Sequence, residues 1–168
     1  MCIVCDNGVS KTIQNPDESQ VWGIDMGVAY FCVDSNGNLI ENPKHHKKYE
    51  RQLRIEGRSL SRKVRFSNRW KKQAKRLGLL HHKIANVRKD FLHKESTKFA
   101  KQYNTVYVED LKISNMVRNK NLSKHILDCG WGMFRDMLTY KTNVIRVNPH
   151  HTQAKRAILV KQKIQRIG

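Results

Sequence analysis

A long helical pattern in the middle of the chain constrains the fold more than any other feature of the sequence. Seven apolar residues recur at steps of three or four positions: Trp70, Ala74, Leu77, Leu80, Ile84, Val87 and Phe91. This spacing places them on one face of a long helix, which needs a partner to cover it. The preceding stretch offers compatible spacing through Tyr49, Leu53, Leu60 and Val64. With a bend at 65–68, the sequence predicts an antiparallel helical hairpin over residues 44–102.

Short strand patterns precede the hairpin. Residues 21–25 and 29–34 are apolar, β-branched and aromatic, and residues 39–41 follow an Asn36-Gly37 turn signal. Asn-Gly tolerates positive φ, so we expect three short antiparallel strands.

Two more strand patterns follow the hairpin. Residues 105–109 and 144–147 are nearly continuous apolar runs, typical of strands buried on both faces. Between them we expect a polar loop at 112–123 and one helical segment over 125–141, with Trp131 as a packing anchor. The 168 residues therefore predict a single α/β domain.

The charge of the chain indicates a polyanionic partner. Thirty-three Lys and Arg stand against fourteen Asp and Glu, a formal net charge of +19. Nucleic acid is the default partner for such an excess, with a membrane surface or an acidic protein as alternatives. Twenty of the cations lie between Lys44 and Gln102, against only Glu50, Glu56, Asp90 and Glu95. Charges of one sign on a single face repel each other. Binding of a nucleic acid to such a face is favourable because the phosphates release their counterions.

Ten cations of the hairpin are the predicted nucleic-acid contacts: Arg58, Arg62, Lys63, Arg65, Arg69, Lys72, Lys75, Arg76, Lys83 and Arg88. The alternative is that these cations form an ordinary solvated face that binds no partner.

The sequence gives no sign of a membrane segment or of export. No apolar run approaches the ~20 residues that a spanning helix needs. Met1 to Cys5 lack a basic leader, so we expect a cytoplasmic protein without a membrane partner. Cys2 and Cys5 form a single C-x-x-C, which is more often two ordinary cysteines than half of a zinc site.

Two carboxylates stand where predicted strands end. Asp25 lies in Gly23-Ile24-Asp25-Met26-Gly27, and Glu109 closes the strand at 105–109. Three antiparallel strands with an acid on the first, then helices, then a strand with a second acid describe a ribonuclease H-like mixed sheet. There the first and fourth strands are neighbours, so both acids could hold Mg²⁺ or Mn²⁺ for attack of water on a phosphodiester. Spacing alone leaves open that both are ordinary strand-end acids.

Six motifs in order resemble the TnpB or OrfB proteins of bacterial insertion sequences, over Val21 to Thr152. They are GIDMG (23–27), LSRK (60–63), HHKIANVRKDFLHKEST (81–97), VYVEDL (106–111), DCGWGMF (128–134) and VIRVNPHHT (144–152). The resemblance implies a RuvC-like, RNA-guided DNA nuclease, related to type V CRISPR effectors. Asp25 and Glu109 would match its first two catalytic, metal-binding acids, and the hairpin would contact guide RNA and its heteroduplex with DNA.

The chain also departs from the family pattern. The family has a larger N-terminal region and, after the last motif, a four-cysteine zinc ribbon and a third catalytic aspartate. Here the last acid is Asp136 and no cysteine follows Cys129. We therefore expect an N-terminal remnant or linker (1–20), a partial RuvC-like domain (21–152) and a basic tail (153–168) that resembles out-of-frame translation. The short link between Lys141 and Val144 is expected to disturb the helix-to-strand connection.

Replacement of the missing acid by a nearby one is not favoured. Asp110 would point to the opposite face of a continuing strand, and Asp128 and Asp136 lie in a predicted helix. The sequence thus predicts a transposon-encoded nucleic-acid-binding protein with two of three RuvC acids. We expect it to be inactive or weakly active alone, so that a complementing fragment would be needed. The alternatives are a non-catalytic RNA- or DNA-binding remnant and a basic structural nucleic-acid-binding protein.

Overall fold

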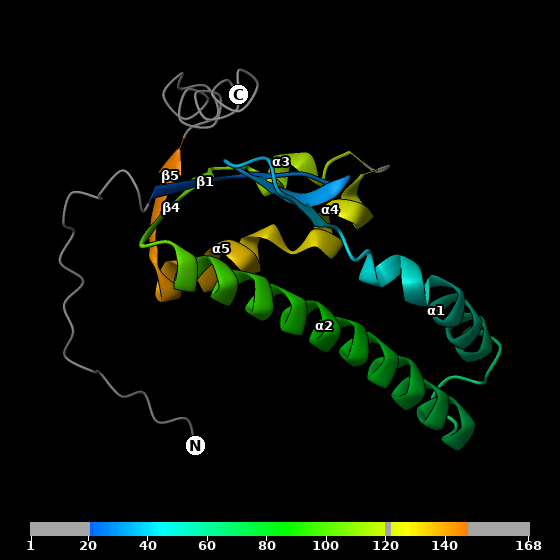
Figure 1. The fold of residues 1–168 in the computed structure, drawn as a ribbon. Helices are drawn as coiled ribbons and strands as arrows, with labels where there is room; N and C mark the ends of the chain where they lie inside the picture. Colours follow the sequence, from blue (N-terminus) through cyan, green and yellow to red (C-terminus); the bar gives the residue numbers. More distant parts are fainter. Residues whose placement is uncertain (1–20, 120–121, 148–168) are drawn as a thin grey trace.

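The computed structural model describes residues 21–119 and 122–147, which form one sheet with a helical layer against it (Figure 1). The elements in chain order are β1 (Val21–Met26), β2 (Tyr30–Asp34), β3 (Leu39–Glu41), α1 (His45–Ser61), α2 (Asn68–Gln102), β4 (Thr105–Glu109), α3 (Ile113–Met116), α4 (Ser123–Cys129), α5 (Trp131–Lys141) and β5 (Asn143–Val147). The predicted N-terminal remnant and basic tail lie outside the described residues, as does the end of the last motif.

The sheet has the strand order β3-β2-β1-β4-β5. The first three strands are antiparallel and β4 lies beside β1, as the sequence predicted, and the structure shows that β1 and β4 are parallel. Gly37 closes the turn before β3 at φ 85, and Asp34 accepts hydrogen bonds from the backbone N–H groups of Asn36 and Asn38 (2.9 and 2.8 Å). The predicted mixed sheet with β1 beside β4 is therefore confirmed.

The hydrophobic core lies between one face of this sheet and the helices α2 and α5. Alternate residues of β1 and β4 point into it, among them Ile24, Val106 and Val108, all with no exposed surface. Leu92 of α2 and Phe134 of α5 meet them there. The residues between these core positions therefore belong to the opposite face of the sheet.

The two late strands differ in burial. Thr105, Val106 and Val108 of β4 are buried and Tyr107 is half-buried, close to the prediction for a central strand. The prediction for β5 was wrong, because no residue of that strand is fully buried. Among the described residues β5 pairs only with β4, so it forms the edge of the sheet.

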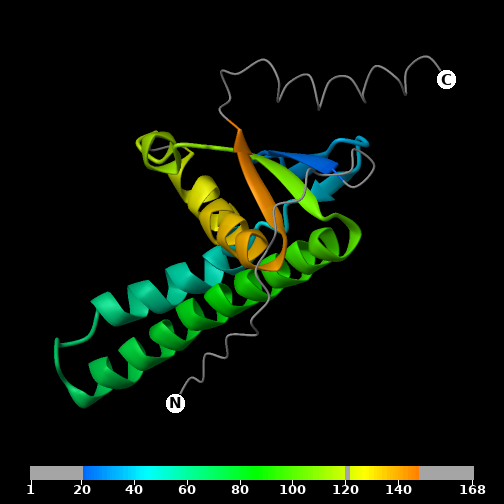
Figure 2. The same ribbon diagram turned by 90° about the vertical axis from the view of Figure 1, so that its left-hand side faces the viewer.

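The helical hairpin is confirmed: α1 and the N-terminal part of α2 run side by side and project away from the sheet (Figure 2). Leu80 and Ile84 are buried in the predicted seam, whereas Trp70 is half-buried instead of forming core. Val64 is 81% exposed, because α1 ends at Ser61 and leaves it in the connection. A polar side chain, Gln73, takes a buried place in the hairpin by donating to the side chain and the carbonyl oxygen of Glu56. No helix in the described part of the chain is long and apolar enough to cross a membrane.

The segment at 125–141 is two helices and not one. Gly130 adopts φ 68 between α4 and α5, a left-handed conformation that interrupts the helical ladder. A Cβ at this position would lie 3.1 Å from Cδ1 of Leu92, so the close approach to α2 also favours glycine. Trp131 directly after it is 2% exposed, which confirms its role as a packing anchor. The expected polar loop at 112–123 contains the short helix α3.

The short link before β5 does not disturb the connection, contrary to the prediction. Thr142 alone joins α5 to β5. Its N–H donates to the carbonyl of Leu138 (2.8 Å), and its hydroxyl donates to the carbonyls of Tyr103 (3.0 Å) and Asn104 (2.9 Å). One well-bonded residue therefore suffices for the turn from helix to strand.

A buried carboxylate connects the end of the hairpin nearest the sheet, here called its root, to the rest of the domain. Asp128 of α4 accepts from the backbone N–H of His46 in the first turn of α1 (2.8 Å). It also accepts from the Arg88 guanidinium of α2 (3.0 Å). A carboxylate is favourable at the N-terminus of a helix because it satisfies an N–H group that has no partner within the helix. Asp128 therefore joins three helices.

His45 beside this anchor makes the stability of the fold depend on pH. Its side chain is buried, and its Nε2 has no hydrogen-bond partner in the described structure. Burial lowers the pKa of His45 below its ordinary 6.5; Lys48 and Arg88 lower this pKa further, and Asp128 opposes them. Below about pH 6.5 the unfolded chain then binds more protons than the folded one. The stabilisation is complete above that pH and is lost as the pH falls toward the folded-state pKa.

We expect His45→Gln to flatten this acid dependence. Urea unfolding of both proteins at several pH values between about 5 and 7.5 measures it. The wild type should lose more free energy of unfolding on acidification than the variant. Parallel curves for the two proteins would show that His45 is not the titrating group.

Candidate functional site

The two predicted acids occupy neighbouring positions on adjacent strands. In the parallel pair of β1 and β4, Ile24 lies opposite Val108. The same register carried one residue further places Asp25 opposite Glu109. Paired parallel strands lie about 4.8 Å apart, and side chains at paired positions point to the same face. The structure thus brings both carboxylates together at the carboxyl ends of two central strands, on the face opposite the core.

The backbone on either side of the two acids is fixed by hydrogen bonds. After β1, the N–H of Gly27 donates to the carbonyl of Phe31 (3.2 Å), and a Cβ at Gly27 would lie 3.2 Å from the carbonyl oxygen of Tyr30. After β4, the N–H of Asp110 donates to the carbonyl of Val147 (2.9 Å). Both acids therefore stand on ordered strand ends.

The surroundings of Asp25 favour the neutral form of its carboxyl. The residue is solvent-exposed as a whole, yet its surroundings partly desolvate the carboxyl and raise its pKa. A divalent ion reverses that effect by stabilising the charged form. Mg²⁺ is held in many sites by one or two carboxylates, with waters and substrate phosphates as further ligands. Asp25 and Glu109 fit such a donor set.

No group of three or more His, Cys, Asp or Glu side chains in residues 21–119 and 122–147 could hold a metal ion. Two of the nearby acids have other contacts: Asp110 pairs with Arg135 (3.1 Å), and Asp128 is the buried anchor described above. Asp136 is exposed on α5. Asp25 and Glu109 are therefore the two described carboxylates that lie at the carboxyl ends of β1 and β4.

The second candidate surface is the basic hairpin. Eight of its ten predicted cations are exposed, and Lys63 and Arg88 are half-buried. From Gly57 to Lys89 the sequence contains no acid. Apart from Arg88, which pairs with Asp128, none of the ten forms an ion pair within the described structure. Their charges are thus available to an external polyanion.

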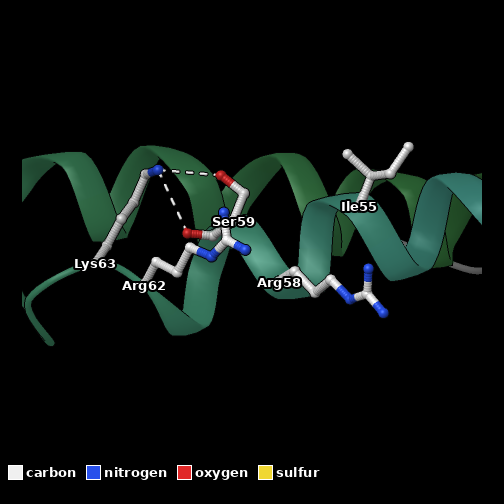
Figure 3. Close-up of a pocket in the computed structure, with 5 residues that line it drawn as sticks. All are labelled: Ile55, Arg58, Ser59, Arg62 and Lys63. Atoms are coloured by element: carbon white, nitrogen blue, oxygen red, sulfur yellow. Dashed lines mark hydrogen bonds between the residues drawn. The ribbon is translucent and has the colours of Figure 1, made fainter.

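A shallow hollow of about 380 Å³ on α1 gathers three of these cations (Figure 3). Its lining residues are Ile55, Arg58, Ser59, Arg62 and Lys63. Lys63 donates from Nζ to the hydroxyl of Ser59 (3.1 Å), and Arg58 and Arg62 stand one helical turn apart. Guanidinium groups so placed can bind phosphate oxygens with two hydrogen bonds each. The charge pattern of the sequence predicted the cations but not Ser59, which the i, i+4 spacing to Lys63 could have indicated.

Comparison with known proteins decides the family. The family model OrfB_IS605, described as "Probable transposase", matches residues 3–120. The chain belongs to the OrfB_IS605 family. The match confirms the resemblance seen in the motifs, and it also covers most of the stretch at 1–20 that was interpreted as a remnant or linker.

Curated relatives of this OrfB_IS605 chain carry nuclease names. It is 38% identical over 165 residues to "Putative RNA-guided DNA endonuclease InsQ" of Escherichia coli (strain K12), which covers 86% of this chain and 41% of the relative. It is 34% identical over 139 residues to "Putative RNA-guided DNA endonuclease" of Streptomyces pristinaespiralis, covering 83% of this chain and 34% of the relative. The chain therefore spans about 34–41% of the length of these relatives.

Proposed function

We propose that this OrfB_IS605 chain contributes the metal-binding acids and a nucleic-acid-binding hairpin to an RNA-guided DNA endonuclease. The observation that carries the proposal is the register of β1 and β4, which sets Asp25 and Glu109 side by side. The strand order β3-β2-β1-β4-β5 supports a RuvC-like, ribonuclease H-like domain for residues 21–147. Asp25 and Glu109 are then its first two catalytic acids.

The proposed cation is Mg²⁺ or Mn²⁺. When bound, such an ion would supply Lewis-acid stabilisation of the phosphodiester and would activate water as a nucleophile. Asp25 and Glu109 supply two negative charges and hard oxygen donors to hold it. Two carboxylates bind such a cation weakly until phosphates of a nucleic acid add ligands, because Mg²⁺ loses its waters reluctantly. We therefore propose that the 168-residue chain by itself cleaves weakly or not at all, and that a complementing segment strengthens the site.

The proposed partners are DNA and guide RNA, bound through the exposed cations of α1, α2 and their connection. Arg88 is left out of this interface, because its charge is neutralised by Asp128. The site of action is proposed to be the prokaryotic cytoplasm. A purely binding role without cleavage is the second candidate, and it is favoured by α1 and the N-terminal part of α2, which project away from the sheet (Figure 1).

The salt dependence of nucleic-acid binding tests the interface. Each phosphate contact contributes about −0.9 to the slope of log affinity against log salt for duplex DNA. We expect the wild type to show a slope of about −5 or steeper in fluorescence anisotropy. Replacing both arginines of the hollow, Arg58→Gln and Arg62→Gln, should reduce the steepness by about 2.

A matched control removes two cations elsewhere on α2. Lys94 and Lys98 are exposed and pair with Asp90 and Glu95 (both 2.7 Å), so they offer little net charge. Lys94→Gln with Lys98→Gln should leave the slope nearly unchanged. A flat response of the wild type to salt, or equal losses in both double variants, would contradict the proposed interface.

A further inference from the structure

The connection between α1 and α2 presents an aromatic side chain to solvent at the far end of the hairpin. Residues 62–67 form this connection, which lies at the end of the hairpin remote from the sheet (Figure 2). The Phe66 side chain is 65% exposed there, although a phenylalanine gains free energy by leaving water. Packing within the domain therefore leaves most of this side chain in contact with water.

The backbone holds Phe66 in an unusual conformation. Its φ of 64 lies in the left-handed region, where a Cβ is strained and glycine is the common residue. The next residue fixes this geometry: Ser67 accepts from the N–H of Trp70 (3.1 Å), and its own N–H donates to the carbonyl of Val64 (3.2 Å). Strained residues of this kind cluster where a protein binds a ligand. The hydrogen bonds of Ser67 thus hold the Phe66 ring in an outward position.

The chemistry around the ring is cationic and aromatic. The Arg65 guanidinium lies over the Phe66 ring, with Cζ 5.0 Å from its centroid. The Trp70 ring lies 5.6 Å away at an angle of 57°. Exposed Arg62 and Arg69 stand at the two ends of the connection. An aromatic face beside several unpaired cations is the composition of sites that bind single-stranded nucleic acid.

We propose that Phe66 is a stacking platform for an unpaired nucleobase, whose flanking phosphates contact Arg62, Arg65 and Arg69. The inference rests on the proposed nucleic-acid-binding function and adds a preference of the hairpin tip for unpaired over paired bases. Every base has a π-face, so the platform is tolerant of sequence. A second copy of the chain is disfavoured as the occupant, because two acid-free tips repel each other.

Binding of two probes tests this proposal. The probes are an oligothymidylate of about 16 nucleotides and a blunt DNA duplex of the same length. Phe66→Ala should weaken binding of the single strand by roughly 5- to 100-fold, with little effect on the duplex. The salt slope should stay unchanged because no charge is removed. Phe66→Trp should restore the affinity, since it restores a stacking surface.

Val64→Ala is the matched control, because Val64 is an even more exposed apolar residue of the same connection without a ring. It should bind both probes like the wild type.

If the wild type binds in a salt-dependent manner but Phe66→Ala binds the single strand equally well, the platform is overturned and the basic interface stands. Equal weakening for both probes also overturns it. If the wild type binds neither probe, the proposed function fails together with the platform. A concentration-dependent dimer that Phe66→Ala abolishes, with single-strand binding unchanged, would make a second copy the occupant instead.

Discussion

Asp128→Ala is expected to destabilise the folded protein by about 3–5 kcal/mol, because it removes a buried carboxylate that makes an ion pair and caps a helix at the same time. The side chains of Asp128 and Arg88 are 8% and 20% exposed in their ion pair. The substitution also removes the acceptor for the N–H of His46 at the start of α1. Three helices would lose their common contact, so the root of the hairpin should be weakened together with global stability.

Asp110→Ala provides the matched control. Its pair with Arg135 has a similar length, 3.1 Å against 3.0 Å, and its cation is equally exposed at 20%. Asp110 itself is 50% exposed, so solvent screens the pair and its loss should cost about 0–1 kcal/mol. Urea unfolding followed by circular dichroism measures both variants. Equal destabilisation by the two substitutions would show that Asp128 is not the anchor that the geometry indicates.

Asp25→Asn and Glu109→Gln should each weaken binding of Mn²⁺ by roughly tenfold or more. Substitutions of residues that only support the ligands lower the metal affinity by about 10- to 100-fold, and these two substitutions remove the charge of a ligand itself. The fold should tolerate Asp25→Asn. Asp25 is exposed and its carboxyl is partly desolvated, so a neutral amide removes an unfavourable charge from β1. Reduced binding would then reflect the site and not unfolding.

Calorimetric titration with Mn²⁺, with and without a bound oligonucleotide, measures this effect. Asp136→Asn is the control, because Asp136 is an exposed acid on α5 and belongs to neither β1 nor β4. It should bind Mn²⁺ like the wild type. Any cleavage of DNA by the chain should fall by orders of magnitude in Asp25→Asn and Glu109→Gln and persist in Asp136→Asn.

The placement of the carboxylate pair could be predicted because local signals agree with it. The Asn36-Gly37 turn orders the first strands, and the acids close two apolar runs at similar positions. Parallel pairing of those runs then brings both acids to one end of the sheet. The hairpin could be predicted equally well, because apolar residues recur at steps of three and four from Trp70 to Phe91.

The contacts that fix the hairpin could not be predicted, because they join residues far apart in the chain. Arg88 and Asp128 are separated by 40 positions, and nothing near either residue identifies the other. Gly130 looked like one small residue within a helix, and only its left-handed conformation against Leu92 separates α4 from α5. Val64 fitted the apolar period, but the helix ends before it.

Paramagnetic broadening by Mn²⁺ in nuclear magnetic resonance spectra of the assigned, isotope-labelled chain tests the carboxylate pair most directly. The amide signals of residues 24–27 and 108–111 should broaden first as Mn²⁺ is added, and this effect should disappear in both Asp25→Asn and Glu109→Gln. Broadening centred elsewhere, or unchanged by the two substitutions, would contradict a cation site formed by these acids.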